Sequence, residues 1–170
     1  MESGPRAHFE RVGEWIQRYF DDPEAFRVMP RTRPGDVVAA LPPEAPELGE
    51  PFDAIFSDFE RVIVPATTHW NHPGFFGYFA TSAAPAAIAA EALAATLDVK
   101  AMLWRASPAA TELEEVTMRW LGRLLGVPAE WSGIIYDTAS VAGFTALAAA
   151  RESVDPTIRE DGLAGSSAPL

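Results

Sequence analysis

Only one segment of this 170-residue chain has the pattern of a buried β-strand, and this limits what the chain can fold into. The segment is the apolar run Gly-Ile-Ile-Tyr-Asp at residues 133–137. A single strand cannot form a sheet by itself, so we expect a mainly α fold in which Ile134 and Ile135 are poorly covered. Residues 36–38 allow at most a shorter strand or extended piece.

Apolar residues spaced three or four positions apart predict five helices in the rest of the chain. These helices cover about residues 5–20, 51–64, 85–97, 108–125 and 141–151. We expect the alanine-rich helix 85–97 to be buried, because small side chains let neighbouring elements approach closely. The helix 108–125 has a predicted buried face, which consists of Leu113, Val116, Trp120, Leu121, Leu124 and Leu125.

Two segments lack a helical period. Residues 27–50 are rich in proline and acidic residues, which is typical of a long connection lying on a surface. Residues 152–170 contain glycine, serine and proline, and we expect this tail to be frayed.

The composition excludes several classes of function. The net charge is −11 without any basic stripe, which argues against nucleic-acid binding. There is no cysteine, so the chain has no disulfide framework and no thiolate zinc site. The longest apolar stretch, residues 82–97, is too short and too alanine-rich to span a membrane, and no apolar signal core follows the N-terminus. We therefore expect a soluble cytoplasmic protein without a metal.

Residues 67–81 form a segment of a different kind, with five aromatic residues, two glycines and a proline. The segment has neither a helical nor a strand period, so it is a loop whose aromatics need cover. Two alternatives stay open: the loop fills a core or a subunit interface, or it forms the wall of a small-molecule pocket. His69 and His72 lack a third ligand nearby, and we expect them to be hydrogen-bonded packing residues.

A strand-to-helix turn at Thr138, Ala139 and Ser140 is the clearest physical signal for a ligand. A helix N-terminus offers unpaired N–H groups and a positive dipole end, and small residues leave room for a phosphate. The simpler alternative is an ordinary N-cap, since Ser and Thr begin many helices. The acidic residues of the preceding predicted helix are interpreted as a charge cluster near its start; they are Glu112, Glu114 and Glu115.

Four linked segments carry a resemblance to a known family. They begin with Thr-His-Trp-Asn-His-Pro at residues 68–73 and Phe-Gly-Tyr-Phe-Ala-Thr at residues 76–81. They continue with residues 104–114, Trp120-Leu121 and residues 135–140. In order and spacing these segments resemble the pyridoxal-5′-phosphate (PLP)-dependent group II decarboxylases, the family of aromatic-L-amino-acid decarboxylase-like enzymes.

The resemblance implies roles for the residues singled out above. Ala139 and Ser140, with Thr138 beside them, correspond to positions that bind the cofactor phosphate. The predicted substrate-contacting positions are Trp70, Tyr78, Phe79 and Thr81, with Thr81 near the substrate carboxylate. The parent reaction converts an L-amino acid to an amine and carbon dioxide.

The resemblance also implies a fold and an assembly. Residues 1–84 correspond to a helical dimerisation segment carrying the aromatic loop. Residues 85–170 correspond to the start of the PLP-binding large domain, an α/β/α domain of the aspartate-aminotransferase type (fold type I). Members of the family are intertwined dimers, so a homodimer is expected.

Several parts of the family's machinery are expected downstream of residue 170. The lysine that holds the cofactor covalently lies in a later segment of the family, and Lys100, the only lysine here, is not in such a motif. The sequence therefore predicts a truncated member with no catalytic residue of its own, inactive alone and with doubtful cofactor binding. The alternatives are a non-catalytic helical dimerisation module, which pairs with itself or a full-length relative, and, more weakly, an unrelated phosphate-ligand binding protein.

Overall fold

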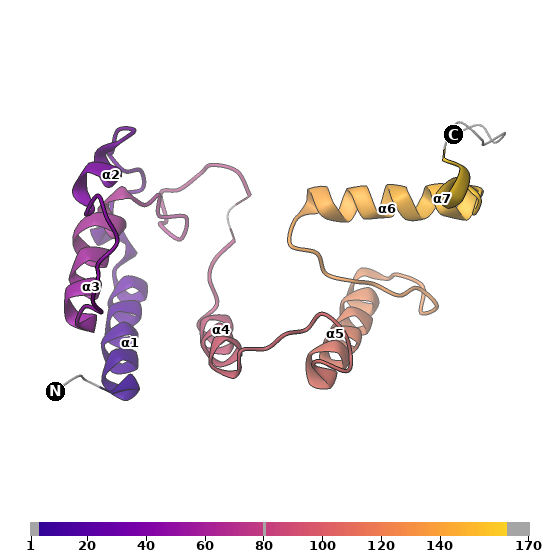
Figure 1. Ribbon diagram of the computed structural model, residues 1–170, viewed down its shortest axis with the longest axis horizontal. Coiled ribbons are helices and arrows are strands. Elements are labelled where there is room, and N and C mark those ends of the chain that lie inside the picture. The colour runs from indigo at the N-terminus through magenta and orange to yellow at the C-terminus, as the bar shows by residue number, and fades with distance from the viewer. Residues whose placement is uncertain (1–3, 80, 163–170) are drawn as a thin grey trace. The chain divides into compact units, whose positions relative to one another are not determined.

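The computed structural model describes residues 4–79 and 81–162, and all regular elements in this described part are helical (Figure 1). The chain divides into two units between Glu91 and Ala92, and each is described by itself. None of the helices in the described ranges is both long enough and apolar enough to cross a membrane. Since the regular elements of the described residues are all helical, the prediction of a mainly α fold is confirmed.

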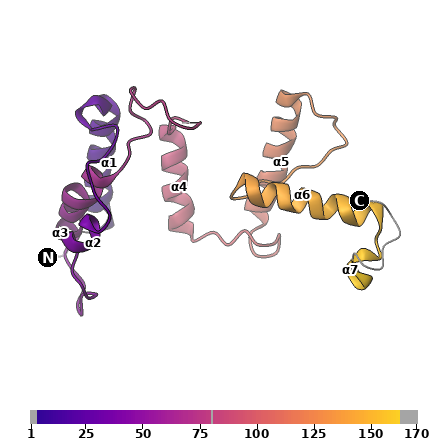
Figure 2. The same cartoon turned by 90° about the horizontal axis from the view of Figure 1, so that it is seen from above.

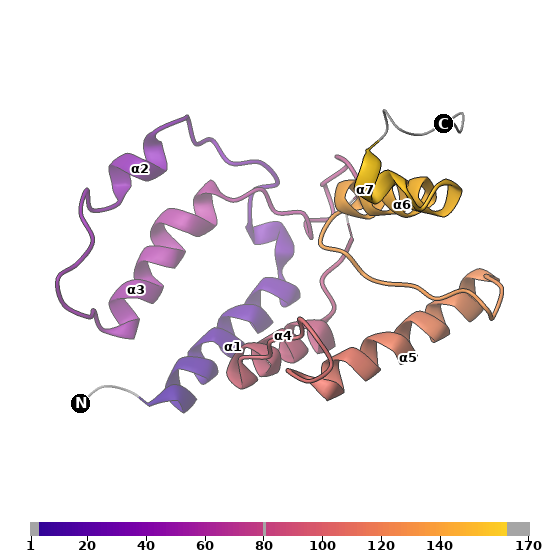
Figure 3. The ribbon, with the colours of Figure 1, turned by 45° about the vertical axis from the view of Figure 1, so that its right-hand side comes forward.

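The first unit is built on two helices that lie side by side and run in the same direction (Figure 3). They are α1 (Pro5–Asp21) and α3 (Phe52–Asp58). The ring of His8 stacks on Phe52 with centroids 4.1 Å apart, and further along Arg18 Nη2 lies 3.3 Å from Glu60 Oε1. Because contacts advance together along both helices, the chain must return over the length of α1 between them. This return explains the long connection predicted at residues 27–50.

α3 continues without a break into a π-helical turn, η2 (Phe59–Ile63), and a 3-10 turn, η3 (Val64–Ala66). Pro65 has no N–H and its ring crowds the preceding turn, so the regular α spacing cannot be kept up to this point. Phe56 and Val62 point into the core of the unit, and each is 7% exposed. The helix predicted at residues 51–64 is confirmed, with this change of helix type.

The return connection contains two short helices, η1 (Pro23–Ala25) and α2 (Asp36–Ala40). The prediction of an extended piece at residues 36–38 is wrong, because that segment lies in α2. Gly35 has φ +97°, a left-handed conformation that favours glycine, and the Asp36 carboxylate accepts a hydrogen bond from Arg33 N–H at 2.7 Å. These local interactions start a helical turn where a lone strand would have no partner.

The second unit contains α5 (Pro108–Leu125), α6 (Ala139–Val154) and α7 (Ile158–Asp161). The boundary between the units falls inside α4 (Pro85–Leu97). α4 and α5 have the predicted bounds, and Gly126 ends α5 with φ +71°. α6 begins two residues before and ends three residues after the predicted helix.

The strand predicted at residues 133–137 is wrong for the described part of the chain, where residues 133–136 have no regular secondary structure and Asp137 lies in a bend. Its one side-chain anchor comes from α5, since Ile135 N–H donates to Glu114 Oε1 at 3.1 Å. Ile134 and Ile135 are 60% and 59% exposed, as predicted for a strand without a sheet.

The predicted burial of α4 and α5 is also wrong in this chain. Leu93 and Leu97 of α4 are exposed, and so are most apolar residues of α5, including Leu124. Both helices have the apolar composition of buried elements, and the described residues do not cover them.

The tail is more ordered than predicted as far as it is described. α6 runs to Val154, and α7 follows it closely (Figure 2). Asp155 Oδ1 accepts hydrogen bonds from both the backbone N–H and the hydroxyl of Thr157, and Ile158 is only 4% exposed. A capping turn and one buried side chain therefore hold residues 152–162, whereas residues 163–170 lie outside the described ranges.

Candidate functional site

The aromatic loop (residues 67–81, with Ala80 outside the description) presents its rings on the surface of the first unit. Trp70 and Tyr78 stack with centroids 5.5 Å apart and planes 10° apart, and Trp70 also contacts Phe75 at 5.0 Å. Tyr78 is 87% exposed and Phe79 99% exposed. The prediction that these rings fill a core is wrong for this chain, because the described residues leave them open. The interface and pocket-wall alternatives stay predictions.

Of the four predicted substrate positions, the structure brings Trp70 and Tyr78 together. Phe79 and Thr81 are exposed on the same loop, and among the described residues no ring contact joins Phe79 to the stacked pair. Tyr78 has φ +53°, a left-handed conformation that costs a non-glycine residue roughly 1 kcal/mol. The stack with Trp70 therefore forms over a strained backbone.

The root of this loop is buried at His69, which is 6% exposed. Its Nδ1 lies 3.1 Å from the Tyr19 hydroxyl of α1, and its Nε2 lies 3.2 Å from the carbonyl oxygen of Val64 in η3. Burial raises the pKa of the Tyr19 phenol, and a hydrogen bond with Asn71 acts in the opposite direction to a smaller extent. The prediction that His69 is a hydrogen-bonded packing residue is confirmed.

Further along, the loop is held by one hydrogen bond within it and one to the segment that follows it. His72 Nδ1 accepts from Gly74 N–H at 2.8 Å, and Asn71 Oδ1 accepts from Ala83 N–H at 3.0 Å. Across the described ranges, no group of three His, Cys, Asp or Glu side chains could hold a metal ion. Both histidines thus have local structural partners.

The second candidate site is the start of α6, which contains Thr138, Ala139 and Ser140. Thr138 is the N-cap, and its Oγ1 accepts from Val141 N–H at 3.2 Å, so the N-cap interpretation is confirmed. The first N–H groups of a helix have no intrahelical partner. Here Ala139 and Ser140 are exposed residues in the first turn of a 16-residue helix, at its positive end, and Ser140 adds a hydroxyl.

The carboxylates near the start of α5 anchor neighbouring segments. Glu112 Oε1 accepts from the Trp104 indole N–H at 2.8 Å, and Glu114 holds Ile135 as described above. Glu114 therefore ties the segment that leads into the Thr138 turn to α5. Sequence patterns do not reveal either contact, since each joins a helix to an irregular segment.

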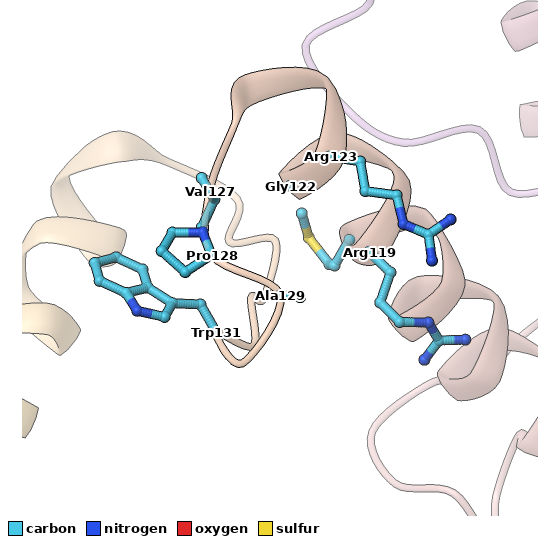
Figure 4. A pocket seen from close by; sticks show the side chains of 8 residues that line it. Arg119, Gly122, Arg123, Val127, Pro128, Ala129 and Trp131 are labelled. Carbon is cyan, nitrogen blue, oxygen red and sulfur yellow. The ribbon is translucent and has the colours of Figure 1, made fainter.

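A separate hollow lies between the end of α5 and the loop that follows it (Figure 4). Its volume is about 100 Å³, and its apolar wall includes Val127, Pro128 and Trp131. The guanidinium groups of Arg119 and Arg123 point away from Trp131 (Figure 4). The hollow is not lined by any of the predicted site residues.

The only lysine is engaged at the surface. Lys100 Nζ pairs with Asp98 Oδ1, and both side chains are more than half exposed. Asp98 itself has φ +48° in the turn after α4.

Comparison with known proteins supplies the family. Residues 34–169 match the conserved domain of the pyridoxal-dependent decarboxylases. The chain belongs to this family. PLP is the family's cofactor, and family members are lyases that act on amino acids.

Individual relatives agree with this assignment. Aromatic-L-amino-acid decarboxylase of Bos taurus is 39% identical over 87% of this chain and 33% of its own length. Tryptophan decarboxylase 2 of Oryza sativa subsp. japonica is 34% identical over 84% of this chain and 30% of its own length. The chain thus spans about a third of the curated relatives that it matches.

Solved structures of decarboxylases share the fold. A structure of Oryza sativa TDC with PLP and tryptamine matches with a TM-score of 0.84 and 32% identity, covering 94% of this chain and 36% of that chain. A structure of Catharanthus roseus tryptophan decarboxylase in complex with L-tryptophan matches with a TM-score of 0.82 and 32% identity, covering 92% and 33%. The matched region is the N-terminal portion of these fold-type-I decarboxylases.

The start of α6 fits the phosphate end of PLP. Two backbone N–H groups and one hydroxyl at a helix N-terminus are the donor set that binds phosphates elsewhere in proteins. Small side chains at Ala139 and Ser140 leave the donors accessible.

Proposed function

We propose that this chain forms the N-terminal part of a PLP-dependent decarboxylase that removes the α-carboxylate of an aromatic L-amino acid. The observation that carries the proposal is the first turn of α6 with its exposed residues Ala139 and Ser140, which lies inside the region that matches the family. Ser140 and Ala139 are proposed to bind the cofactor phosphate, with Thr138 fixing the turn by capping α6. When bound, PLP supplies an acceptor for the electron pair left behind as carbon dioxide departs.

The aromatic loop is proposed to provide the substrate wall. Trp70, Tyr78 and Phe79 offer flat apolar rings to an aromatic side chain, and Thr81 offers a hydroxyl to the substrate carboxylate. The exposure of these rings supports this proposal, because a wall needs rings that the chain itself does not cover. The division into a dimerisation segment, residues 1–84, and the start of a large domain, residues 85–170, is part of the same proposal.

The 170-residue chain is proposed to be inactive by itself. Its one lysine is paired with Asp98 on an exposed turn, away from any predicted site residue in the sequence. A homodimer and a cytoplasmic location for the parent enzyme stay predictions.

Titration with PLP tests the phosphate site directly. We expect amide NMR signals of residues 138–142 to shift with PLP and not with pyridoxal, which lacks the phosphate. Ser140→Ala should weaken the shifts, whereas Lys100→Arg should leave them in place. Equal shifts with pyridoxal would contradict the proposed phosphate site. Release of carbon dioxide from L-tryptophan by the chain alone would contradict its inactivity.

A second candidate is a non-catalytic helical dimerisation module, and the exposed apolar residues of α5 favour it. Leu124 and Leu125 are 82% and 77% exposed, which is unusual for a chain that stays monomeric. Size-exclusion chromatography and circular dichroism separate the two candidates. A well-folded dimer that ignores PLP supports the module, and a poorly cooperative monomer supports the enzyme fragment.

A further inference from the structure

The aromatic loop meets α1 at Tyr19, which contacts the buried ring of His69 and hydrogen-bonds with the side chain of Asn71. The ring of His69 reaches Tyr19 at 3.1 Å and the Val64 carbonyl at 3.2 Å, and its backbone N–H donates to Val28 O at 3.0 Å. The next residue, Trp70, is already 46% exposed. The change from buried to open surface therefore takes place within one residue.

The partners of the His69 ring determine where its hydrogen lies. A backbone carbonyl only accepts hydrogen bonds, so in the neutral ring Nε2 must carry the hydrogen that bonds to Val64. Nδ1 is then an acceptor, and the Tyr19 hydroxyl is the donor. Burial raises the pKa of Tyr19, so the phenol stays protonated and keeps its donor role at neutral pH.

Hydrogen bonds and stacking carry this order from His69 into the loop. His72 N–H donates to the His69 carbonyl at 3.0 Å, and Phe75 N–H donates to the His72 carbonyl at 2.9 Å. These two consecutive turns place the ring of Phe75 against Trp70, and Trp70 stacks on Tyr78. The orientation of Trp70 is thus linked to His69 in two ways: Trp70 follows His69 in the chain, and it contacts Phe75, which the two turns connect back to His69.

We propose that Tyr19 is a positioning residue for the substrate loop: by donating to His69 Nδ1 it holds in place the ring whose tautomer Val64 sets, and with it the stacked arrangement of Trp70 and Tyr78. The substrate part of this inference rests on the proposed function of the loop. The hydroxyl has this role apart from the ring of Tyr19, which packs on Trp15 at 5.3 Å and on Phe26 at 4.8 Å. Removing only the hydroxyl should therefore disturb the loop and leave the helix packing in place.

NMR on the full 170-residue chain tests this positioning role. In the wild type we expect long-range ¹H–¹⁵N spectra to show His69 with its hydrogen on Nε2, and ring NOEs between Trp70 and Tyr78. Tyr19→Phe should leave the hydrogen on Nε2, where Val64 still accepts it, but should shift the His69 Nδ1 signal and weaken those NOEs, while the amide signals of α1 and α3 keep their positions. Tyr136→Phe is the matched control, because it removes a tyrosine hydroxyl from the other unit and should change neither observation.

Two outcomes would overturn the inference. One is a wild-type His69 with its hydrogen on Nδ1, which requires no variant and so does not depend on whether Tyr19→Phe folds. The other is a Tyr19→Phe chain in which the His69 Nδ1 signal and the Trp70–Tyr78 NOEs are unchanged. Loss of the α1 and α3 signals in Tyr19→Phe would also count against it, since the hydroxyl would then be needed for packing generally.

A ligand titration separates this inference from the proposed function. If the loop binds aromatic substrates, L-tryptophan should shift the Trp70 indole signal, and Tyr19→Phe should weaken that binding about fivefold, as loss of one hydrogen bond does. If L-tryptophan leaves the wild-type signal unchanged, the proposed substrate wall fails. The tautomer and NOE results would still decide whether Tyr19 orders the loop.

Discussion

The two units of this chain differ in how far their apolar residues are exposed. In the first unit, α1 and α3 turn their rings toward each other, and Phe56 is 7% exposed. In the second unit, α5 and α6 have comparable apolar residues on open surface, and Phe144 is 74% exposed. The first unit thus contains both sides of its main helix contact, whereas the second contains helices whose covering partners are not among the described residues.

A matched pair of phenylalanine substitutions offers the most severe test of this difference. Phe56→Ala should lower the free energy of unfolding of the first unit by about 3 kcal/mol, because a buried ring is lost and a cavity is left. Phe144→Ala should change stability by less than about 0.5 kcal/mol, as expected for an exposed position. Urea unfolding followed by amide NMR signals from each unit measures both. Equal losses would show that Phe144 is covered in solution.

The helix predictions succeeded where the pattern is local. The bounds of α4 and α5 follow from Pro85, Pro108 and Gly126, residues whose backbone preferences act within one turn. The strand at residues 133–137 failed because pairing requires a second strand, which residue spacing alone cannot supply. The same reasoning accounts for α5, whose apolar stripe is real but has no described partner.

The candidate site shows the same limit. Thr138 as an N-cap could be predicted because its partner, Val141, lies three residues away. The contact between Tyr19 and His69 could not, since it joins positions 50 residues apart and requires the parallel arrangement of α1 and α3. The stack of Trp70 on Tyr78 also forms with Tyr78 in the left-handed conformation, at φ +53°, which the sequence does not predict for a tyrosine.

Charge pairs give a second and smaller test of the contact between α1 and α3. Arg11 lies 4.7 Å from the centre of the Phe56 ring, and its Nη1 lies 3.1 Å from Asp53 Oδ1. Arg11→Ala should therefore cost between about 1 and 2 kcal/mol of the first unit's stability. Arg6→Ala removes only an exposed pair with Glu10 inside α1 and should have no measurable effect. Thermal unfolding monitored by circular dichroism compares the two, and similar losses would contradict the assigned contact.

Local capping should matter more than packing for the second unit. Thr138→Ala should destabilise the first turn of α6 by about 1 kcal/mol, because Val141 N–H loses its side-chain acceptor. Thr138→Ser keeps a hydroxyl at this place and should behave as the wild type. Hydrogen exchange of the Val141 and Ala142 amides measures the effect. Unchanged exchange in Thr138→Ala would mean that contacts outside this turn hold the helix start.

The smallest expected effect is a pH dependence confined to the first unit. Burial raises the pKa of Tyr19 above its ordinary value of 10.0, so the folded state favours the neutral phenol. The resulting stability is fully present below the unfolded pKa of about 10 and is lost as the pH rises through the folded pKa. Urea midpoints of the first unit should thus fall at alkaline pH in the wild type, and Tyr19→Phe should remove that part of the decline. Because the variant keeps the ring against Trp15 and Phe26, an identical decline in both proteins would place the titrating group elsewhere.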